Sequence, residues 1–421
     1  MASWRSESRR QTRRSAIIRA VDRAPSLALV LALLAGTLGV GMAIKQPCVT
    51  GPWDGRQYTH LCYTDLIPLY GTEHLQGNRL PYLDACPASD GQCDEYPVLT
   101  MYAMRGAAWL APGTTTGFYL ANVALLIICA IAVALCLFYV GGYRAIYFVA
   151  APTLAIYGFI NWDLIAVAFA TAATVAYLRK RDGWSGVLLG LGTAAKLYPV
   201  LLVVPFVLGR LREGRRREAV RLAVGAAVAW LVVNLPFAAL APKSWMVFFR
   251  FNSARLPDWD SLWFIGCQTH STGGQACLPG SVSIVNAVSA IGFVVLSVIV
   301  WRIKKRRHPH FERWTFGLPM LILFLLSNKV YSPQYSLWLL PWFALALPDW
   351  RLFAAFEAAD VAVFVTRFLF FAHLTSDAGL PFWPFEVALL ARAVVLVVCV
   401  SAWVLRRAEP LPVPVAEPAR L

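Results

Sequence analysis

The chain has few charged residues and lacks several widespread motifs. Charged side chains make up 14% of its 421 residues, whereas soluble domains carry roughly 25%, so the composition excludes an ordinary soluble protein. No G-x-G-x-x-G segment and no phosphate-binding P-loop occurs in the sequence, which argues against the common nucleotide sites. We also find no repeat of the kind that builds solenoids.

Apolar residues are what the chain has in abundance. They make up 58% of the sequence, and the mean hydropathy is +0.58. Apolar runs near 20 residues long, enough to cross a ~30 Å hydrocarbon core, recur throughout. The net charge of +15 would suggest nucleic acid in a soluble protein, but its placement between apolar runs follows the positive-inside rule instead.

These runs predict an all-α polytopic membrane protein with about twelve crossings, counting one broken segment as a hairpin. An Arg-rich leader, residues 1–25, precedes the first run, and no small-residue cleavage pattern follows it, which favours an uncleaved anchor. The hairpin is interrupted at AAKLYPV. The predicted spans are residues 26–44, 118–139, 145–158, 164–178, 184–209 (the hairpin), 219–240, 281–301, 315–326, 335–347, 352–372 and 385–405.

Basic clusters set the predicted orientation. The leader, RLREGRRREAVR, RIKKRRHPHFER and the arginines after residue 405 all fall on one side of these spans, and that side should be the cytoplasm. We therefore expect both termini in the cytoplasm of a cell-membrane protein. The predicted units are the leader, a membrane domain over 26–405 and a disordered, Pro-rich tail over 406–421.

Two long loops, 45–100 and 241–280, are predicted on the opposite, extracytoplasmic side and hold six of the nine cysteines. An even number of cysteines in each loop suggests disulfides in an oxidising compartment. Local pairing is the simplest of several schemes. It gives Cys48–Cys62, Cys86–Cys93 and Cys267–Cys277. A zinc site is the less favoured alternative, because no pair has the C-x₂-C spacing common in structural zinc sites.

Polar residues gather on the same predicted side. Ionised groups at membrane depth are costly and mark functional sites by default; there, cations could hold a phosphate and a carboxylate could accept a proton. Each has a plainer interpretation as well: a loop carboxylate, a helix cap, a snorkelling lysine, or, for Arg367, an ion pair with Glu357, Asp360 or Asp377. The candidates are Asp65, Glu95, Tyr96, Asp163, Lys196, Tyr198, Lys329, Tyr331, Gln334 and Arg367.

Four short motifs in order resemble a known family. They are Asp65 followed by GNRLPY (Gly77 to Tyr82), then EYPV (Glu95 to Val98), then KLYP (Lys196 to Pro199), and finally SPQYSLWLLP (Ser332 to Pro341). This order resembles glycosyltransferase family 87, the polyprenol-phosphate-mannose-dependent mannosyltransferases of actinobacterial cell envelopes, which have a GT-C fold. Val98 stands where a second proline is usual. That departure and the cysteine-rich loop indicate a subgroup, whose sugar is mannose or a related pentose.

The resemblance implies a mechanism. Asp65 would be the general base that deprotonates an acceptor hydroxyl on a glycolipid or glycan. The hydroxyl would attack the anomeric carbon of a polyprenyl-phosphate sugar with inversion. Lys196, Lys329 and Arg367 would neutralise the leaving phosphate, and the remaining candidates would bind substrate. No cofactor is expected, and the role of a divalent cation stays open.

Two other classes of protein remain open at this stage. A secondary transporter could use Asp163, Lys196 and Arg367 as a relay at the membrane midplane, although the polar residues gather outside the midplane and no inverted-repeat symmetry is visible. A membrane scaffold without catalytic activity is the other alternative, but it would not need a folded acidic loop.

Overall fold

The computed structural model describes residues 26–87, 93–268, 282–376, 378–407 and 409–412. Every regular element within these ranges is a helix, which confirms the all-α prediction. The basic leader, most of the tail and Cys277 lie outside the described residues, so the Cys267–Cys277 pair does too.

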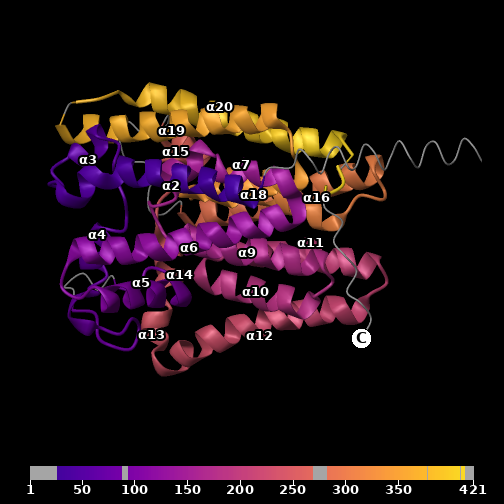
Figure 1. The fold of residues 1–421 in the computed structure, drawn as a ribbon, viewed down its shortest axis with the longest axis horizontal. Helices are drawn as coiled ribbons and strands as arrows, with labels where there is room; N and C mark the ends of the chain where they lie inside the picture. The colour runs from indigo at the N-terminus through magenta and orange to yellow at the C-terminus, as the bar shows by residue number, and fades with distance from the viewer. Residues whose placement is uncertain (1–25, 88–92, 269–281, 377, 408, 413–421) are drawn as a thin grey trace, which may run out of the picture.

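The helices form one elongated bundle whose long members lie roughly side by side (Figure 1). Their bounds are as follows: α2 Leu27–Thr50, α3 Arg56–Thr59, α4 Pro68–Thr72, η1 Gln76–Asn78, α5 Val98–Leu110, α6 Thr115–Gly141, η2 Gly142–Ala145, α7 Ile146–Val149, α8 Pro152–Tyr157, α9 Asp163–Leu178, α10 Asp182–Ala195, α11 Pro199–Arg212, α12 Arg216–Leu240, α13 Pro242–Trp245, α14 Val247–Ala254, α15 Leu262–Gln268, α16 Val282–Arg307, η4 Arg313–Phe316, α17 Gly317–Ser327, η5 Pro333–Trp338, α18 Leu340–Ala346, α19 Trp350–Ser376 and α20 Phe382–Leu405.

Five segments in the described part of the chain are long and apolar enough to cross a membrane. They are Leu27–Thr50, Thr115–Val149, Arg216–Leu240, Val282–Arg307 and Phe382–Leu405. The other predicted spans are shorter helices, such as α9 and α17, or carry charge along their length, as α19 does with Glu357, Asp360 and Arg367. The count of about twelve crossings therefore stays a prediction.

The predicted hairpin is present and breaks where expected. α10 ends at Ala195, and α11 begins at Pro199, where proline is favoured because its missing N–H is not needed in the first turn. α10 lies tightly against α12 because Gly186 has no side chain: a Cβ there would be 2.1 Å from the Leu222 carbonyl oxygen. The KLYP turn is thus held at the end of a closely packed helix pair.

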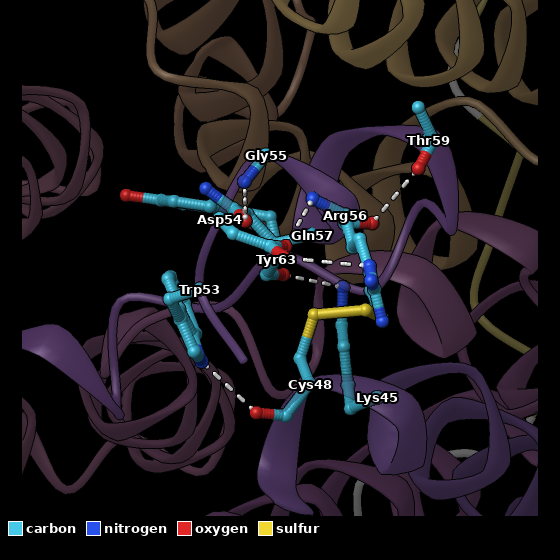
Figure 2. Close-up of a disulfide and its surroundings, with 10 residues drawn as sticks. Lys45, Cys48, Trp53, Asp54, Gly55, Arg56, Gln57, Thr59 and Tyr63 are labelled. Carbon is cyan, nitrogen blue, oxygen red and sulfur yellow. Dashed lines mark hydrogen bonds and ion pairs between the residues drawn. A yellow bond between two sulfur atoms is a disulfide. The ribbon is translucent and has the colours of Figure 1, made fainter. Parts of the chain in front are cut away.

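A disulfide links the first loop to the first predicted span. α2 runs on to Thr50, beyond the predicted end of the span at residue 44, so Lys45 and Cys48 belong to the helix. Cys48 pairs with Cys62, and Cys86 pairs with Cys93, as predicted. Figure 2 shows Lys45 beside the first disulfide, where its buried amino group donates to the Tyr63 carbonyl at 2.9 Å.

The basic segments meet at the other end of the bundle. α3, α4 and α13 lie at the left of Figure 1, while the turn between α11 and α12 lies at the right. There Arg210 is 2.6 Å from Asp182, which follows the α9 helix, and Arg212 donates to the Pro309 carbonyl at 2.7 Å. Three basic segments that are distant in sequence are therefore held together at one end.

Candidate active site

A cavity of about 520 Å³ lies where the first loop, the KLYP turn, the segment after α14 and the segment after α17 converge. Two smaller pockets, of about 10 Å³ and 60 Å³, lie elsewhere in the described residues. The cavity wall includes eight of the ten predicted site residues. Those eight are Asp65, Glu95, Tyr96, Lys196, Tyr198, Lys329, Gln334 and Arg367.

Asp65 is fixed on both oxygens. The Tyr63 hydroxyl donates to one at 2.8 Å, and the Asn161 amide donates to the other at 2.7 Å. The backbone N–H of Asp65 donates to the Ile160 carbonyl at 2.8 Å. Burial raises the pKa of the Asp65 carboxyl, although the Asn161 and Tyr63 hydrogen bonds oppose the shift. A raised pKa brings a carboxylate closer to the basicity that proton abstraction near neutral pH requires.

Tyr96 extends this network on the side of the EYPV motif. The Asn161 amide lies 2.7 Å from the Tyr96 hydroxyl as well as 2.7 Å from Asp65. The ring of Tyr96 meets Trp162 edge to face, with centroids 5.6 Å apart. Asn161 therefore connects Asp65, early in the first loop, with the EYPV motif at the end of that loop in one hydrogen-bond network.

Lys196 is already partnered. Its amino group is 3.0 Å from Asp163, which is fully buried and also accepts from the Trp338 indole at 2.7 Å. Burial lowers the pKa of Lys196, but Asp163, Tyr335 and Asp65 together outweigh it, so that this pKa is raised. Asp163 lies behind the cavity wall rather than on it. The KLYP and SPQY motifs thus meet through this pair and through Tyr198, whose ring stacks on Trp338 at 4.2 Å.

Arg367 also has a carboxylate partner, but it is neither Glu357 nor Asp360, the two described carboxylates that the sequence suggested. Its Nε is 2.8 Å from Asp260, a buried residue of the segment between α14 and α15. Glu357 instead accepts from Thr153, and Asp360 pairs with Arg392 at 3.1 Å. Asp377 lies outside the described residues. Arg367 still reaches the cavity wall.

Lys329 differs from both. Its amino group donates to the backbone carbonyls of Ser253 at 3.0 Å and Arg255 at 2.6 Å, and no ion pair to it occurs among the described residues. Burial, followed by the neighbouring Arg255 charge, lowers the pKa of Lys329 to about 8. Gln334 lines the same wall, whereas Tyr331 does not. Tyr331 packs against Arg392, whose guanidinium lies 3.8 Å from the ring centre.

The sequence analysis missed the contribution of the segment after α14. Arg255 and Asp258 line the cavity and lie 3.6 Å apart, and the Ser332 hydroxyl donates to Asp258 at 2.8 Å. The signal was available, since ARLPDWD places three charged residues in a loop already predicted on the side of Asp65. Tyr58 and Phe371 add an aromatic wall, with their rings edge to face at 5.6 Å.

A metal centre finds no support in the part of the chain that the structure describes, where no three His, Cys, Asp or Glu side chains gather. Asp65, Asp163 and Asp260 are engaged with a tyrosine and an amide, a lysine, and an arginine, respectively. What the arrangement can do is accept a proton at Asp65 and hold an anion near Lys329 and Arg255.

Comparison with known proteins finds one matching family. Residues 95–328 match glycosyltransferase family 87, a match that spans more than half of the chain. No curated protein matches the chain. The match begins at Glu95 and so includes EYPV and KLYP, while Asp65 precedes it.

Solved structures give distant similarities. ArnT from Cupriavidus metallidurans bound to undecaprenyl phosphate shares 14% identity with a TM-score of 0.43, over 90% of this chain and 77% of that one. The apo state of ArnT gives the same identity and TM-score, over 90% and 76%. The Archaeoglobus fulgidus oligosaccharyltransferase shares 12% identity with a TM-score of 0.42; the match covers 90% of this chain but 56% of that longer protein.

Proposed function

Because the chain belongs to glycosyltransferase family 87, we propose that it transfers a sugar from a polyprenyl-phosphate donor to a glycolipid or glycan of the cell envelope. Membership in this family favours a membrane transferase over the transporter and scaffold alternatives. The observation that carries the proposal is the shared cavity, in which the Asp65 carboxylate and the Lys329 and Arg255 cations line one space.

Asp65 is the proposed general base. It takes the proton from an acceptor hydroxyl while that oxygen attacks the anomeric carbon of the donor. The bond between the anomeric carbon and the phosphate oxygen breaks, polyprenyl phosphate leaves, and the configuration inverts. Tyr63 and Asn161 hold the carboxylate in place, which supports catalysis because a fixed base loses no freedom as the reaction proceeds.

The leaving phosphate is assigned to Lys329 and Arg255. Charge develops on phosphate oxygens as the bond breaks, and fixed cations stabilise it best in a water-poor site. Lys196 and Arg367 each face a buried carboxylate at 3.0 Å or less, so their charges are largely balanced, whereas Arg255 lies farther from its carboxylate neighbour Asp258, at 3.6 Å. Lys329 contacts only carbonyl oxygens among the described residues, and it therefore contributes net positive charge to the cavity.

The prenyl chain is assigned to the apolar side of the same cavity. Phe248 and Phe251 of α14 and Phe324 of α17 line the cavity, and the Arg255 guanidinium lies 5.6 Å from the centre of the Phe251 ring. Rings at this position give the chain an apolar surface next to the phosphate site, as in most lipid and cofactor pockets. The proposed reaction uses neither a nucleotide nor another organic cofactor. The sugar is mannose or a related pentose.

The active site is proposed to face the extracytoplasmic side, with the basic end in the cytoplasm. A single cysteine introduced at the exposed Gln76 should react with a membrane-impermeant maleimide in intact cells. One introduced at the exposed Arg217 should react only after the membrane is opened. The reverse pattern would contradict the proposed orientation.

Transfer itself is tested with purified protein in detergent or vesicles. We expect release of polyprenyl phosphate from a polyprenyl-phosphate mannose or pentose when a glycolipid acceptor is present, and none from the Asp65→Asn variant. A Glu312→Gln variant at the exposed basic end is a matched control and should release as much as the wild type. Movement of intact donor across sealed vesicles without release would favour a transporter instead.

A further inference from the structure

A buried carboxylate outside the cavity joins the two halves of the first loop. Glu73 is 1% exposed and follows α4. Its two oxygens accept the backbone N–H groups of Asp94 at 2.6 Å and Glu95 at 3.3 Å. Asp94 has φ 69°, in the left-handed region that non-glycine residues adopt rarely. The Glu73 side chain thus helps to hold the turn that presents Glu95 and Tyr96 to the cavity, although the turn contains an unfavourable backbone conformation.

The backbone of Glu73 is connected through α4 to Asp65, the proposed base. The Leu69 N–H donates to the Asp65 carbonyl at 3.2 Å, and the Glu73 N–H donates to the Leu69 carbonyl at 3.1 Å. Two successive helical hydrogen bonds therefore connect Asp65 with Glu73 through α4. On the far side, Tyr96 reaches Asp65 through Asn161. Glu73 closes a ring of contacts around the Asp65 carboxylate.

Further contacts hold the same turn. Arg79 donates to the Glu73 carbonyl at 3.2 Å and to the Asp94 carboxylate at 2.6 Å, and the Tyr82 hydroxyl donates to the Tyr96 carbonyl. Arg79 and Tyr82 belong to the GNRLPY motif, which contributes nothing to the cavity wall. The GNRLPY motif therefore has a structural role, because it holds the turn that leads into EYPV.

We propose that Glu73 is a positioning residue for sugar transfer, fixing the Glu95–Tyr96 turn and, through Tyr96 and Asn161, the orientation of the Asp65 carboxylate. This rests on the proposed function. Both acceptor oxygens are needed, since each faces one backbone donor. A protonated Glu73 or a glutamine presents one donor and one acceptor to two N–H groups, and one of the two hydrogen bonds is then lost.

This requirement makes the turn sensitive to pH. Burial, which outweighs the bonds from Asp94 and Glu95, raises the pKa of Glu73 to about 8. As pH falls through this value Glu73 takes up a proton and the turn loosens, so turnover at saturating donor should rise with pH through about 8. The titratable and charged groups facing Glu73 are Arg79, Tyr82, Asp94, Glu95 and Tyr96.

The test uses Glu73→Gln in the full chain, with Glu312→Gln as the matched control. We expect kcat at pH 9, where wild-type Glu73 is ionised, to fall roughly 10- to 100-fold, as for a small misplacement of a catalytic group, with little change in donor KM and loss of the step near pH 8. Hydrogen exchange should become faster in a peptide covering residues 93–97 and stay unchanged in one from α9. Wild-type kcat, or unchanged exchange, would overturn the proposal.

A folding failure of Glu73→Gln does not leave the question unanswered. In the wild-type protein, exchange in residues 93–97, corrected for its intrinsic pH dependence, should slow as pH rises from 7 to 9; no change would overturn the proposal. Because exchange needs no substrate, this result is independent of sugar transfer. A wild-type protein that releases no polyprenyl phosphate but shows the exchange effect contradicts the proposed function and leaves the role of Glu73 in the turn intact.

Discussion

The two ends of the bundle use charge in opposite ways. At the basic end, Arg210 meets Asp182 at 2.6 Å, Glu213 at 3.0 Å and the Tyr177 carbonyl, so that its donors are all engaged by the fold. At the cavity end, Lys329 contacts carbonyl oxygens of Ser253 and Arg255. Both cations are buried, but Arg210 is balanced by carboxylates, whereas Lys329 has no carboxylate partner among the described residues.

This difference separates a cation that holds helices together from a cation that can receive a ligand. Burying an ion pair costs desolvation energy for both charged groups, and removing one partner is strongly destabilising. Arg210 therefore stabilises the fold together with its carboxylate partners. Lys329 has desolvation without a counter-ion, which its lowered pKa reflects. A phosphate would supply the missing charge. The proximity of a cation to a pocket is therefore a weaker criterion than the state of its partners.

The largest expected effect is a loss of turnover from a substitution at the cavity end alone. Asp65→Asn keeps the size of the side chain but removes the base, and we expect turnover to fall by about 10²–10⁴-fold because that is what a positioned general base contributes. Folding and donor binding should remain. Release of polyprenyl phosphate measures the loss. Asp54→Asn and Asp84→Asn, both exposed in the same loop, are the controls.

A different outcome would reassign the base rather than the reaction. Near-wild-type turnover by Asp65→Asn together with an inactive Glu95→Gln would give the role to Glu95, the other cavity carboxylate of the loop. Asp94 is unsuitable as a control, because it pairs with Arg79 at 2.6 Å and is buried.

Arg210→Met tests the basic end. Removing one partner of a buried pair typically costs about 3–5 kcal/mol, so the unfolding midpoint in detergent should drop markedly. Turnover per folded molecule should stay at the wild-type level, because the cavity lies at the other end. Arg217→Met, an exposed neighbour, should change neither quantity. A selective loss of turnover without destabilisation would contradict the division between the two ends.

Lys329→Gln sharpens the comparison within the cavity. Hydrogen bonds to charged groups are worth about 1.5–3 kcal/mol, so donor KM should rise about 10- to 150-fold. Lys196→Gln should act mainly on stability, since it leaves the buried Asp163 without its cation. Lys243→Gln, exposed on α13, is the matched control. Equal donor KM values for wild type and Lys329→Gln would remove Lys329 from the phosphate site.

The smallest expected effect is a pH dependence of donor binding. The pKa of Lys329 is lowered to about 8, so the free enzyme loses this cation as pH rises above that value. Donor KM should then increase by up to about tenfold per pH unit. Lys329→Arg should bind donor with little dependence on pH in the same range, because arginine stays charged. An identical alkaline rise in the arginine variant would assign it to another group.

Much of the fold and part of the site could be predicted from local patterns. The hairpin break at KLYP follows from a proline between two apolar halves, and the Cys48–Cys62 and Cys86–Cys93 pairs follow from short separations. Asp65 could be placed in the first loop by motif order. These features depend on residues close in sequence, which is why a single chain reveals them.

Features that depend on packing between distant segments could not be predicted. Asp360 lies seven residues before Arg367 on α19, about 10 Å along the helix at 1.5 Å per residue, and Asp260 reaches Arg367 instead from another loop. Tyr331 was a candidate for substrate binding because it lies on the predicted extracytoplasmic side, and it packs against Arg392 without lining the cavity. The sequence places Arg255 and Asp258 in a loop predicted on the side of Asp65, but their position beside Lys329 depends on where α14 packs.

The short span of the first disulfide bears on the order in which the protein is made. Cys48 and Cys62 are 14 residues apart, and Asp65 lies shortly after them, so in the proposed orientation this cross-link can close once the first loop has left the ribosome and crossed the membrane. The helices that supply Lys196, Arg255 and Lys329 are synthesised later. The base would then be anchored to the first membrane helix before its partners exist, and later helices would assemble around it.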